Sequence, residues 1–250
     1  MLAKLSVDKA LVKAKSHVKK KEVIEAKKLY GLILQTFPKN LRAQQGLAAL
    51  NKPNQNNTLQ IAPQETVDQL VNLYNQGQFS AVIEQAQDLT KQYPHTFVVW
   101  NILGVSRAQI GKLDEAIEAY NKSIALKPDY YEAYYNLGLA FKDQGKLEQA
   151  LEAYNKSITL KPDYYEAYFN IGSIFHDQGK LDNAIEAYNK SIALKPDYAI
   201  AYSNMGLTFH DQGKLEKALE AYNKSVALKP DYPVAYYNMG STFRYQGKLD

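Results

Sequence analysis

Asparagine recurs at one fixed position in the second half of the chain, and its amide group is the first candidate for chemistry. The four residues are Asn136, Asn170, Asn204 and Asn238, each 34 residues from the next. Asparagine is a mediocre helix former, so its recurrence inside helical segments requires an explanation. Its side chain offers a donor and an acceptor, and can pair with both the N–H and the C=O of a peptide backbone. The pattern favours non-covalent recognition of a peptide.

Other reactive side chains do not combine into a catalytic or metal-binding arrangement. His176 and His210 also lie 34 residues apart, but helices pack about 8–10 Å apart, whereas two imidazoles on one zinc ion need nitrogens within about 4 Å of each other. We expect both histidines to face solvent. The segment from Gly138 to Lys146 has leucine where a phosphate loop requires Ser or Thr. We therefore expect no catalytic residue, no enzyme activity, no metal and no cofactor.

The chain is organised by a repeat of 34 residues. Five prolines mark it at equal intervals: Pro94, Pro128, Pro162, Pro196 and Pro230. A segment of this length is too short to bury its own core, but it suffices for two helices joined by tight turns. We therefore expect each unit to stack on its neighbours.

Each unit has the pattern of two helices. In residues 131–164 the larger apolar residues recur every three or four positions, which is a helical spacing. Gly145 separates the two runs and suits a left-handed turn. Asp163 and Glu166 have the spacing of a capping box at the start of the following helix, as do Asp129 and Glu132.

Several positions carry a specific resemblance. The spacing W-x-x-L-G-x-x-Y, A-x-x-x-F and P is that of the tetratricopeptide repeat (TPR). Arg107 is the one departure in the first full unit, and the matching residues there are Trp100, Leu103, Gly104, Ala116, Tyr120 and Pro128. The chain resembles bacterial TPR arrays and the superhelical array of O-linked N-acetylglucosamine transferase. The resemblance implies an all-α fold, a right-handed superhelical solenoid of antiparallel helix pairs.

The resemblance also implies a binding groove lined by the first helix of each repeat. In the transferase array, asparagines at the matching position contact the backbone of extended substrates. The expected peptide-binding residues are therefore Asn136, Asn170, Asn204 and Asn238, with Tyr135, Phe169 and Tyr237 beside them. The alternative is that these asparagines form hydrogen bonds between repeats, or persist through recent duplication.

The period predicts the domain organisation. Residues 1–51 form a diverged, basic TPR-like unit with a short additional helix. Residues 52–63 are rich in amides and include two prolines, as a linker would be. The array occupies residues 64–250, and its expected units are an irregular repeat at 64–96, full repeats at 97–130, 131–164, 165–198 and 199–232, and an incomplete repeat at 233–250.

Charge and composition limit the function classes. Residues 1–52 carry twelve Lys/Arg against three Asp/Glu, and the remainder carries eighteen against twenty-three, so the leading unit is basic and the array acidic. No arginine or aromatic platform accompanies the lysines, so we expect a solvated helix pair and no nucleic-acid partner. The chain has no cysteine. It has no apolar run of membrane-spanning length and no signal-peptide core, which predicts no membrane partner and cytoplasmic residence.

These features give three functional hypotheses. The leading one is a non-catalytic scaffold for protein–protein interaction that binds an extended peptide or partner segment in its concave groove. The alternative is the N-terminal arm of a larger bacterial transferase, which would recruit substrates to a catalytic domain beyond residue 250. A third is a self-assembling array. The incomplete final repeat also predicts weak end-to-end self-association.

Overall fold

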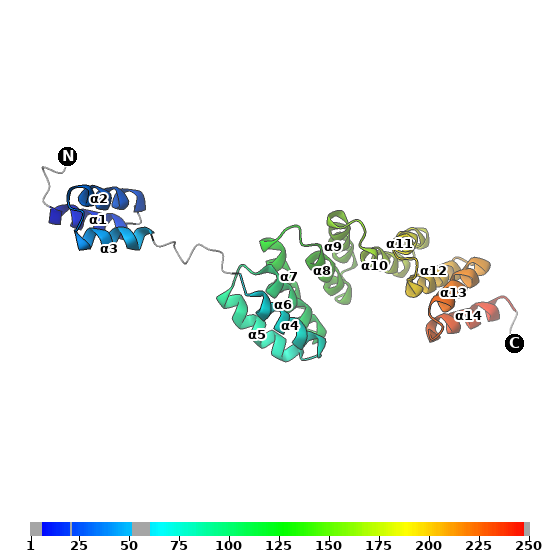
Figure 1. Cartoon of the computed structure of the whole chain (residues 1–250). Coiled ribbons are helices and arrows are strands. Elements are labelled where there is room, and N and C mark those ends of the chain that lie inside the picture. Colours follow the sequence, from blue (N-terminus) through cyan, green and yellow to red (C-terminus); the bar gives the residue numbers. More distant parts are fainter. Residues whose placement is uncertain (1–6, 21, 52–60, 248–250) are drawn as a thin grey trace. The chain divides into compact units, whose positions relative to one another are not determined.

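The computed structural model describes residues 7–20, 22–51 and 61–247, and within these ranges it contains fourteen α-helices and no strand (Figure 1). The chain divides into two compact units, residues 1–60 and 61–250. The predicted linker at 52–63 lies outside the described residues for most of its length. The expectation of an all-α chain of consecutively paired helices is confirmed.

The first unit contains α1 (Val7–Lys19), α2 (Val23–Thr36) and α3 (Leu41–Asn51). Its core is built around Ala14, Tyr30, Ile33 and Ala43, all of which are buried. Ala14 stands where the regular repeats carry glycine. The ring of Tyr30 instead lies against Gly46 on α3, where an added Cβ would come within 2.4 Å of the ring. In this unit the glycine that makes room for the tyrosine ring is therefore on α3 and not on α1.

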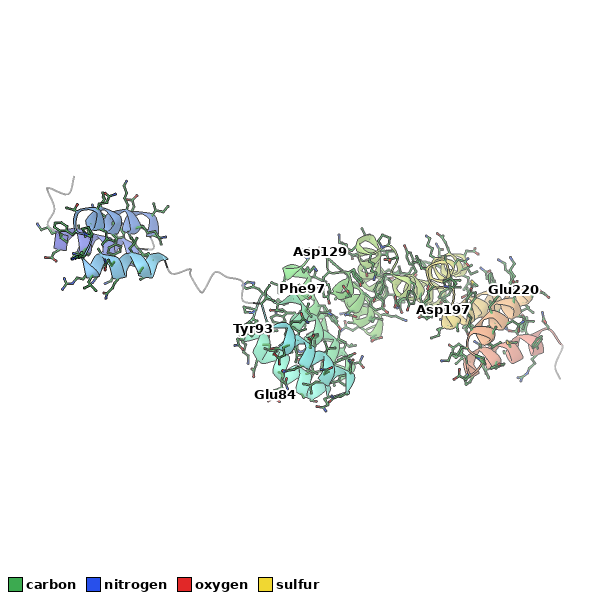
Figure 2. The ribbon with its side chains drawn as sticks, viewed as in Figure 1. Glu84, Tyr93, Phe97, Asp129, Asp197 and Glu220 are labelled. Carbon is green, nitrogen blue, oxygen red and sulfur yellow. The ribbon has the colours of Figure 1, made fainter. Side chains whose placement is uncertain are left out.

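The second unit is a series of helix pairs. We call the leading helix of each pair the first helix, and these are α4 (Gln64–Asn75), α6 (Phe97–Gln109), α8 (Tyr131–Asp143), α10 (Tyr165–Asp177), α12 (Ala199–Asp211) and α14 (Pro233–Tyr245). The second helices are α5 (Phe79–Gln92), α7 (Leu113–Leu126), α9 (Leu147–Leu160), α11 (Leu181–Leu194) and α13 (Leu215–Leu228). The main contacts join helices one or two places apart along the chain, as expected for a solenoid. Charged side chains such as Glu84 on α5 and Glu220 on α13 lie on the surface (Figure 2).

The turn between the helices of each pair depends on glycine. Gly145 has φ +74°, and the matching glycines of the other units have similar values. Only glycine adopts this left-handed conformation without a steric cost. The predicted left-handed turn is therefore confirmed.

Close packing within each full repeat rests on a glycine and a tyrosine. On α8, a Cβ added at Gly138 would lie 2.6 Å from the ring of Tyr154 on α9. The same contact is 2.5 Å at Gly104 and 2.7 Å at both Gly172 and Gly206. The tyrosine rings are fully buried, so glycine is required wherever a second helix places its tyrosine.

A buried serine also ties each second helix to its first helix. Ser157 Oγ on α9 donates a 3.0 Å hydrogen bond to the carbonyl oxygen of Tyr131, the first residue of α8. Equivalent bonds of 2.8–2.9 Å are donated by Ser123, Ser191 and Ser225. Because these hydroxyls are buried, each bond satisfies a polar group that would otherwise be costly to bury.

The predicted capping boxes are wrong. Helices α8 and α10 begin at Tyr131 and Tyr165, and their N-cap residues, Tyr130 and Tyr164, make no side-chain cap hydrogen bond. The aspartates lie one residue before the N-cap, too early in the chain to cap the helix. Instead, the ring of Tyr164 packs edge-on against Tyr131 at 5.1 Å, and Lys161 Nζ lies 4.5 Å from the centre of the Tyr131 ring. An aromatic cluster closes the repeat junction.

Candidate protein-interaction surface

The first helices of successive repeats share one face, which we call the first-helix face. Side-chain contacts cross it between each neighbouring pair from α6 to α14. Asn136 Nδ2 donates to Asn101 Oδ1 at 3.1 Å, and Asn170 Nδ2 donates to the Tyr135 hydroxyl at 3.2 Å. His176 Nε2 lies 2.8 Å from Asp211 Oδ2. The rings of His210 and Tyr245 are 5.6 Å apart. The repeats thus form a continuous surface along these helices.

The four asparagines do not share one environment. Asn136 and Asn170 make bonds between repeats, which is the structural alternative considered for them above. Asn170 also donates to the carbonyl oxygen of Glu166 and is buried. The residue of the preceding repeat that corresponds to Tyr135 is Phe169, which has no hydroxyl to accept such a bond from Asn204. Asn204 instead hydrogen-bonds the Tyr188 phenol; burial raises the pKa of this phenol and the bond from Asn204 lowers it in part. Asn238 is partly buried on α14.

The three aromatic candidates also differ. Tyr135 packs against Tyr154 and Tyr164, with ring centres 5.7 and 4.9 Å away. Phe169 makes the matching contacts in the next repeat. Tyr237 is 78% exposed on α14. The first two aromatics are therefore only partly available to a ligand, whereas the third is almost fully accessible.

The phenols of Tyr135 and Tyr198, beside this face, stay neutral near pH 7 because the pKa of each is raised. Burial raises the pKa of Tyr135, and the carboxylate of Glu166 adds to the shift. Burial, followed by the neighbouring Tyr165, raises the pKa of Tyr198 to about 12. Neither of these two phenols therefore adds charge to the face at neutral pH.

The histidines are not free in solvent, which corrects that expectation. His176 Nε2 contacts one oxygen of Asp211, and His210 Nδ1 lies 3.3 Å from the other. Both imidazoles are about a fifth exposed, at 21% and 23%. Across the described ranges no group of three His, Cys, Asp or Glu could hold a metal ion. The pair therefore acts as a polar tie between α10 and α12.

A shallow pocket on the first-helix face was not predicted from the sequence. It lies between α4 and α6, has a volume of about 150 Å³, and is lined by Val71, Tyr74, Asn101, Ile102 and Val105. Val71 and Val105 are 34 residues apart, so they hold the same place in successive repeats. That repetition of valine at one position of the repeat was the available signal.

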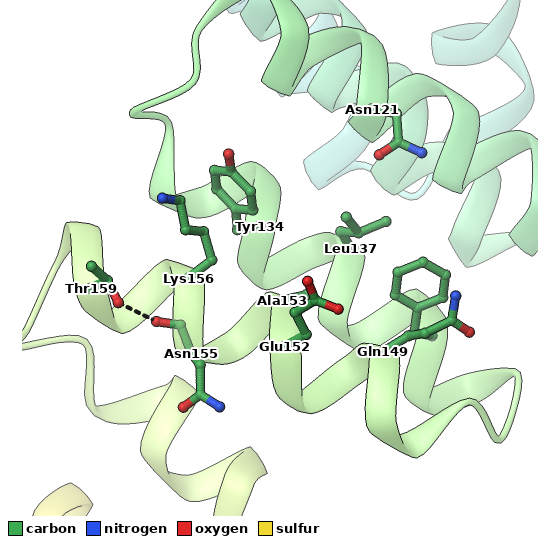
Figure 3. Close-up of a pocket in the computed structure, with 10 residues that line it drawn as sticks. Asn121, Tyr134, Leu137, Gln149, Glu152, Ala153, Asn155, Lys156 and Thr159 are labelled. Atoms are coloured by element: carbon green, nitrogen blue, oxygen red, sulfur yellow. Dashed lines mark hydrogen bonds between the residues drawn. The ribbon is translucent and has the colours of Figure 1, made fainter.

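Pockets also recur where successive second helices flank a first helix. One of about 550 Å³ lies among α7, α8 and α9. Figure 3 shows Tyr134 and Leu137 from α8, Asn121 from α7, and Glu152 and Lys156 from α9 around it. Related pockets of about 150 and 260 Å³ follow one and two repeats later. From the sequence, the aromatic residues of these pockets were expected only to form the core. The spacing of residues does not show how closely neighbouring second helices approach, so the pockets were not predicted.

Comparison with known proteins identifies the repeats. A family model described as TPR repeat matches residues 104–145, 139–179, 172–213 and 206–247, which together span more than half of the chain. The chain belongs to the TPR family. A crystal structure of the TPR-like chain MamA is 30% identical, with a TM-score of 0.59, covering 64% of this chain and 93% of that one. YrrB, described as a TPR protein with an unusual peptide-binding site, is 20% identical over 73% of this chain and 93% of its own, with a TM-score of 0.58. That likeness shows the fold alone.

A curated relative is the peroxisomal targeting signal receptor of Kluyveromyces lactis, which is 36% identical over 63 residues. The match covers 25% of this TPR chain and 11% of the receptor. The chain thus aligns with about a tenth of the length of that relative.

Family membership indicates a protein–protein interaction scaffold, since TPR proteins bind protein or peptide partners. They are generally non-catalytic. In the part of the chain that the structure describes, none of the helices is long and apolar enough to cross a bilayer.

Proposed function

We propose that this TPR array is a non-catalytic scaffold of the cytoplasm, which holds an extended segment of a partner protein against its first-helix face. The observation that carries the proposal is the recurrence of amide side chains at one position of four consecutive first helices, next to aromatic and apolar groups. A series of equally spaced amides suits a backbone, whose N–H and C=O groups recur regardless of sequence.

The curated relative supports a peptide as the ligand. Its name describes a receptor for a targeting signal, and 63 of its residues align with this chain at 36% identity. By analogy, the partner segment would be an extended peptide. Its sequence would be read by pockets such as the one lined by Val71 and Val105.

The second candidate function is that of a recruiting arm in a larger bacterial transferase. The observation that favours it is that the 63-residue match covers only 11% of the receptor, so the matching segment belongs to a much longer protein. In this case the same face would bind substrate segments for a catalytic domain. The native gene sequence following residue 250 distinguishes the two, because a transferase domain there is expected only under the second.

The proposed site can be mapped with spin labels, because the chain has no cysteine of its own. A peptide selected by display against the array serves as the probe. A label on Asp177→Cys, which is exposed on α10, is expected to broaden the peptide's NMR signals. The matched control is a label on Asn155→Cys, which is exposed on α9 and lines two of the pockets between successive second helices. This label should not broaden the peptide's signals. Broadening from position 155 alone, or failure to select any peptide, would contradict the proposal.

Weak end-to-end self-association through the last repeat stays a prediction of the sequence. Its physical basis is exposed aromatic surface on α14, where Tyr236 is 50% and Tyr245 74% exposed. Static light scattering over a concentration series is the measurement. An apparent mass that does not rise with concentration would rule the association out.

A further inference from the structure

Glu166, the second residue of α10, holds a carboxylate whose hydrogen-bonding capacity is not filled. Its oxygen Oε2 is buried and has no hydrogen-bond partner among the described residues. An ionised carboxylate accepts several hydrogen bonds, and a buried acceptor that is left without one is costly. The residue as a whole is only partly buried, so the group borders the surface. The site therefore calls for a donor that the described residues do not supply.

The neighbours of Glu166 place it on the first-helix face, at the junction of α8 and α10. Asn170, one turn later on α10, donates to the backbone carbonyl of Glu166 at 3.0 Å and to the Tyr135 hydroxyl of α8 at 3.2 Å. The rings of Tyr135 and Tyr164 pack beside it with centres 4.9 Å apart. Burial raises the pKa of both phenols, and the charge of Glu166 adds to each shift. The site thus combines one negative charge with neutral aromatic rings.

The lysine near this junction is engaged elsewhere. Lys195 Nζ donates to the Tyr165 hydroxyl at 2.9 Å, which is the main cause of its raised pKa, and Glu166 contributes least. The same lysine lies 4.6 Å from the centre of the Tyr165 ring, as Lys161 lies 4.5 Å from that of Tyr131. Tyrosine rings at the repeat junctions therefore accept cations, while the carboxylate of Glu166 keeps no base of its own.

The equivalent position in the other repeats shows that this carboxylate is particular to one junction. The position is apolar at Val98, Ile200 and Val234. In the preceding repeat it is Glu132, which hydrogen-bonds the Tyr131 hydroxyl and has no buried oxygen without a partner. An acidic residue in the first turn stabilises a helix. That effect explains a glutamate here, but not a buried oxygen that lacks a donor.

We propose that the junction at Glu166 is a subsite for an arginine side chain of the partner segment, a specificity that rests on the function proposed above. A guanidinium is planar and forked, so it donates to both oxygens of a carboxylate while it stacks on aromatic rings. Lysine has a single ammonium group and no such fork. The charge balance agrees, because the chain beyond residue 52 carries eighteen Lys/Arg against twenty-three Asp/Glu. The ligand is therefore an extended segment in which one position is arginine.

A double-mutant cycle tests the pairing. Peptides are selected by display against the full chain, and the arginine expected at one enriched position is replaced by citrulline, which keeps the shape of the side chain without its charge. Citrulline should weaken binding to the wild type by about tenfold or more, as for a hydrogen bond to a charged group. With Glu166→Gln, the two peptides should bind about equally. Lysine in place of arginine should bind several-fold more weakly to the wild type.

The matched control is Glu148→Gln, which removes the same charge from an exposed position on α9. It should leave the preference for arginine over citrulline unchanged. Thermal melting followed by circular dichroism checks that Glu166→Gln is folded, and the citrulline peptide tests the wild type independently of that variant.

Peptides that are broadened by the label on Asp177→Cys but carry no enriched arginine would overturn the subsite and leave the proposed function standing. So would equal binding of citrulline to the wild type, or a preference for arginine that survives Glu166→Gln. A lysine peptide that binds as tightly as the arginine peptide would overturn the assignment to arginine. Failure to select any peptide, or selection only of peptides broadened from Asn155→Cys, would instead overturn the proposed function and the subsite together.

Discussion

Replacing Tyr154 by alanine is expected to lower the free energy of unfolding by about 3–5 kcal/mol, the range for deleting a buried aromatic side chain. The ring is fully buried between α8 and α9. It packs over Gly138 and against Tyr135, so its loss leaves a cavity in the middle of the array. Urea denaturation monitored by circular dichroism measures the change.

Tyr154→Phe separates the ring from its hydroxyl. The hydroxyl oxygen is buried and has no hydrogen-bond partner among the described residues. Burying such a group costs about 1–3 kcal/mol, so removing it should leave the stability unchanged or raise it. A Phe variant as unstable as the Ala variant would show that the hydroxyl, and not the packing of the ring, holds the repeat together.

A glycine pair provides a further control within the same experiment. Gly206→Ala forces a Cβ to within 2.7 Å of the Tyr222 ring, and overpacking of this kind costs about 1–3 kcal/mol. Gly240→Ala meets no described atom within 4 Å. It should stabilise by up to about 1 kcal/mol, because alanine is the better helix former. Equal effects at the two sites would contradict the packing described for the full repeats.

Replacing all four asparagines of the first-helix face by alanine is expected to weaken binding of an extended peptide by about 2–6 kcal/mol. This follows from about 0.5–1.5 kcal/mol per hydrogen bond and rough additivity. Successive repeats lie about 10 Å apart and an extended chain advances about 3.3 Å per residue. Each amide would therefore meet the peptide about once every three residues. Isothermal titration with a display-selected peptide is the measurement.

The structure divides these four residues into groups with different expected outcomes. Asn136 and Asn170 tie neighbouring repeats, so their double alanine variant should lower the unfolding free energy as well as the affinity. Asn204 instead hydrogen-bonds the buried Tyr188 phenol. Asn238 forms no bond to a neighbouring repeat among the described residues, so a single Asn238→Ala variant should lose affinity with little loss of stability. If neither variant changes the affinity while the first destabilises, the asparagines are structural and the main argument for backbone recognition fails.

The period and the helical spacing were sufficient to predict the helix pairs, because both depend on residues close in sequence. Gly145, for example, interrupts one apolar run and requires only its own backbone conformation. The predicted cap at Asp163 failed for a reason that is also local: Tyr164, one residue later, is the N-cap, and its ring is held by Tyr131.

The partners of the face residues could not be predicted, because each depends on a side chain one repeat away. Asn170 donates to the hydroxyl of Tyr135, whereas the corresponding residue for Asn204 is Phe169, which has no hydroxyl, and Asn204 bonds the Tyr188 phenol instead. Likewise, the bond from His176 to Asp211 spans 35 residues and requires the register of α10 on α12. A pattern that treats repeats as identical cannot show where one substitution removes a partner.

The main contacts among the described helices of the array join helices one or two places apart along the chain, and this has a mechanical consequence. Few side-chain bonds join one first helix to the next, and they are single links such as that of His176 to Asp211. Tension applied along the array would therefore load these links, together with the packing of each second helix on the next first helix, before the more extensively packed helix pairs. Within the second unit, extension would therefore separate neighbouring repeats while each helix pair stays intact. The spacing of the amides along the first-helix face would then increase with the force that a bound partner exerts on the array.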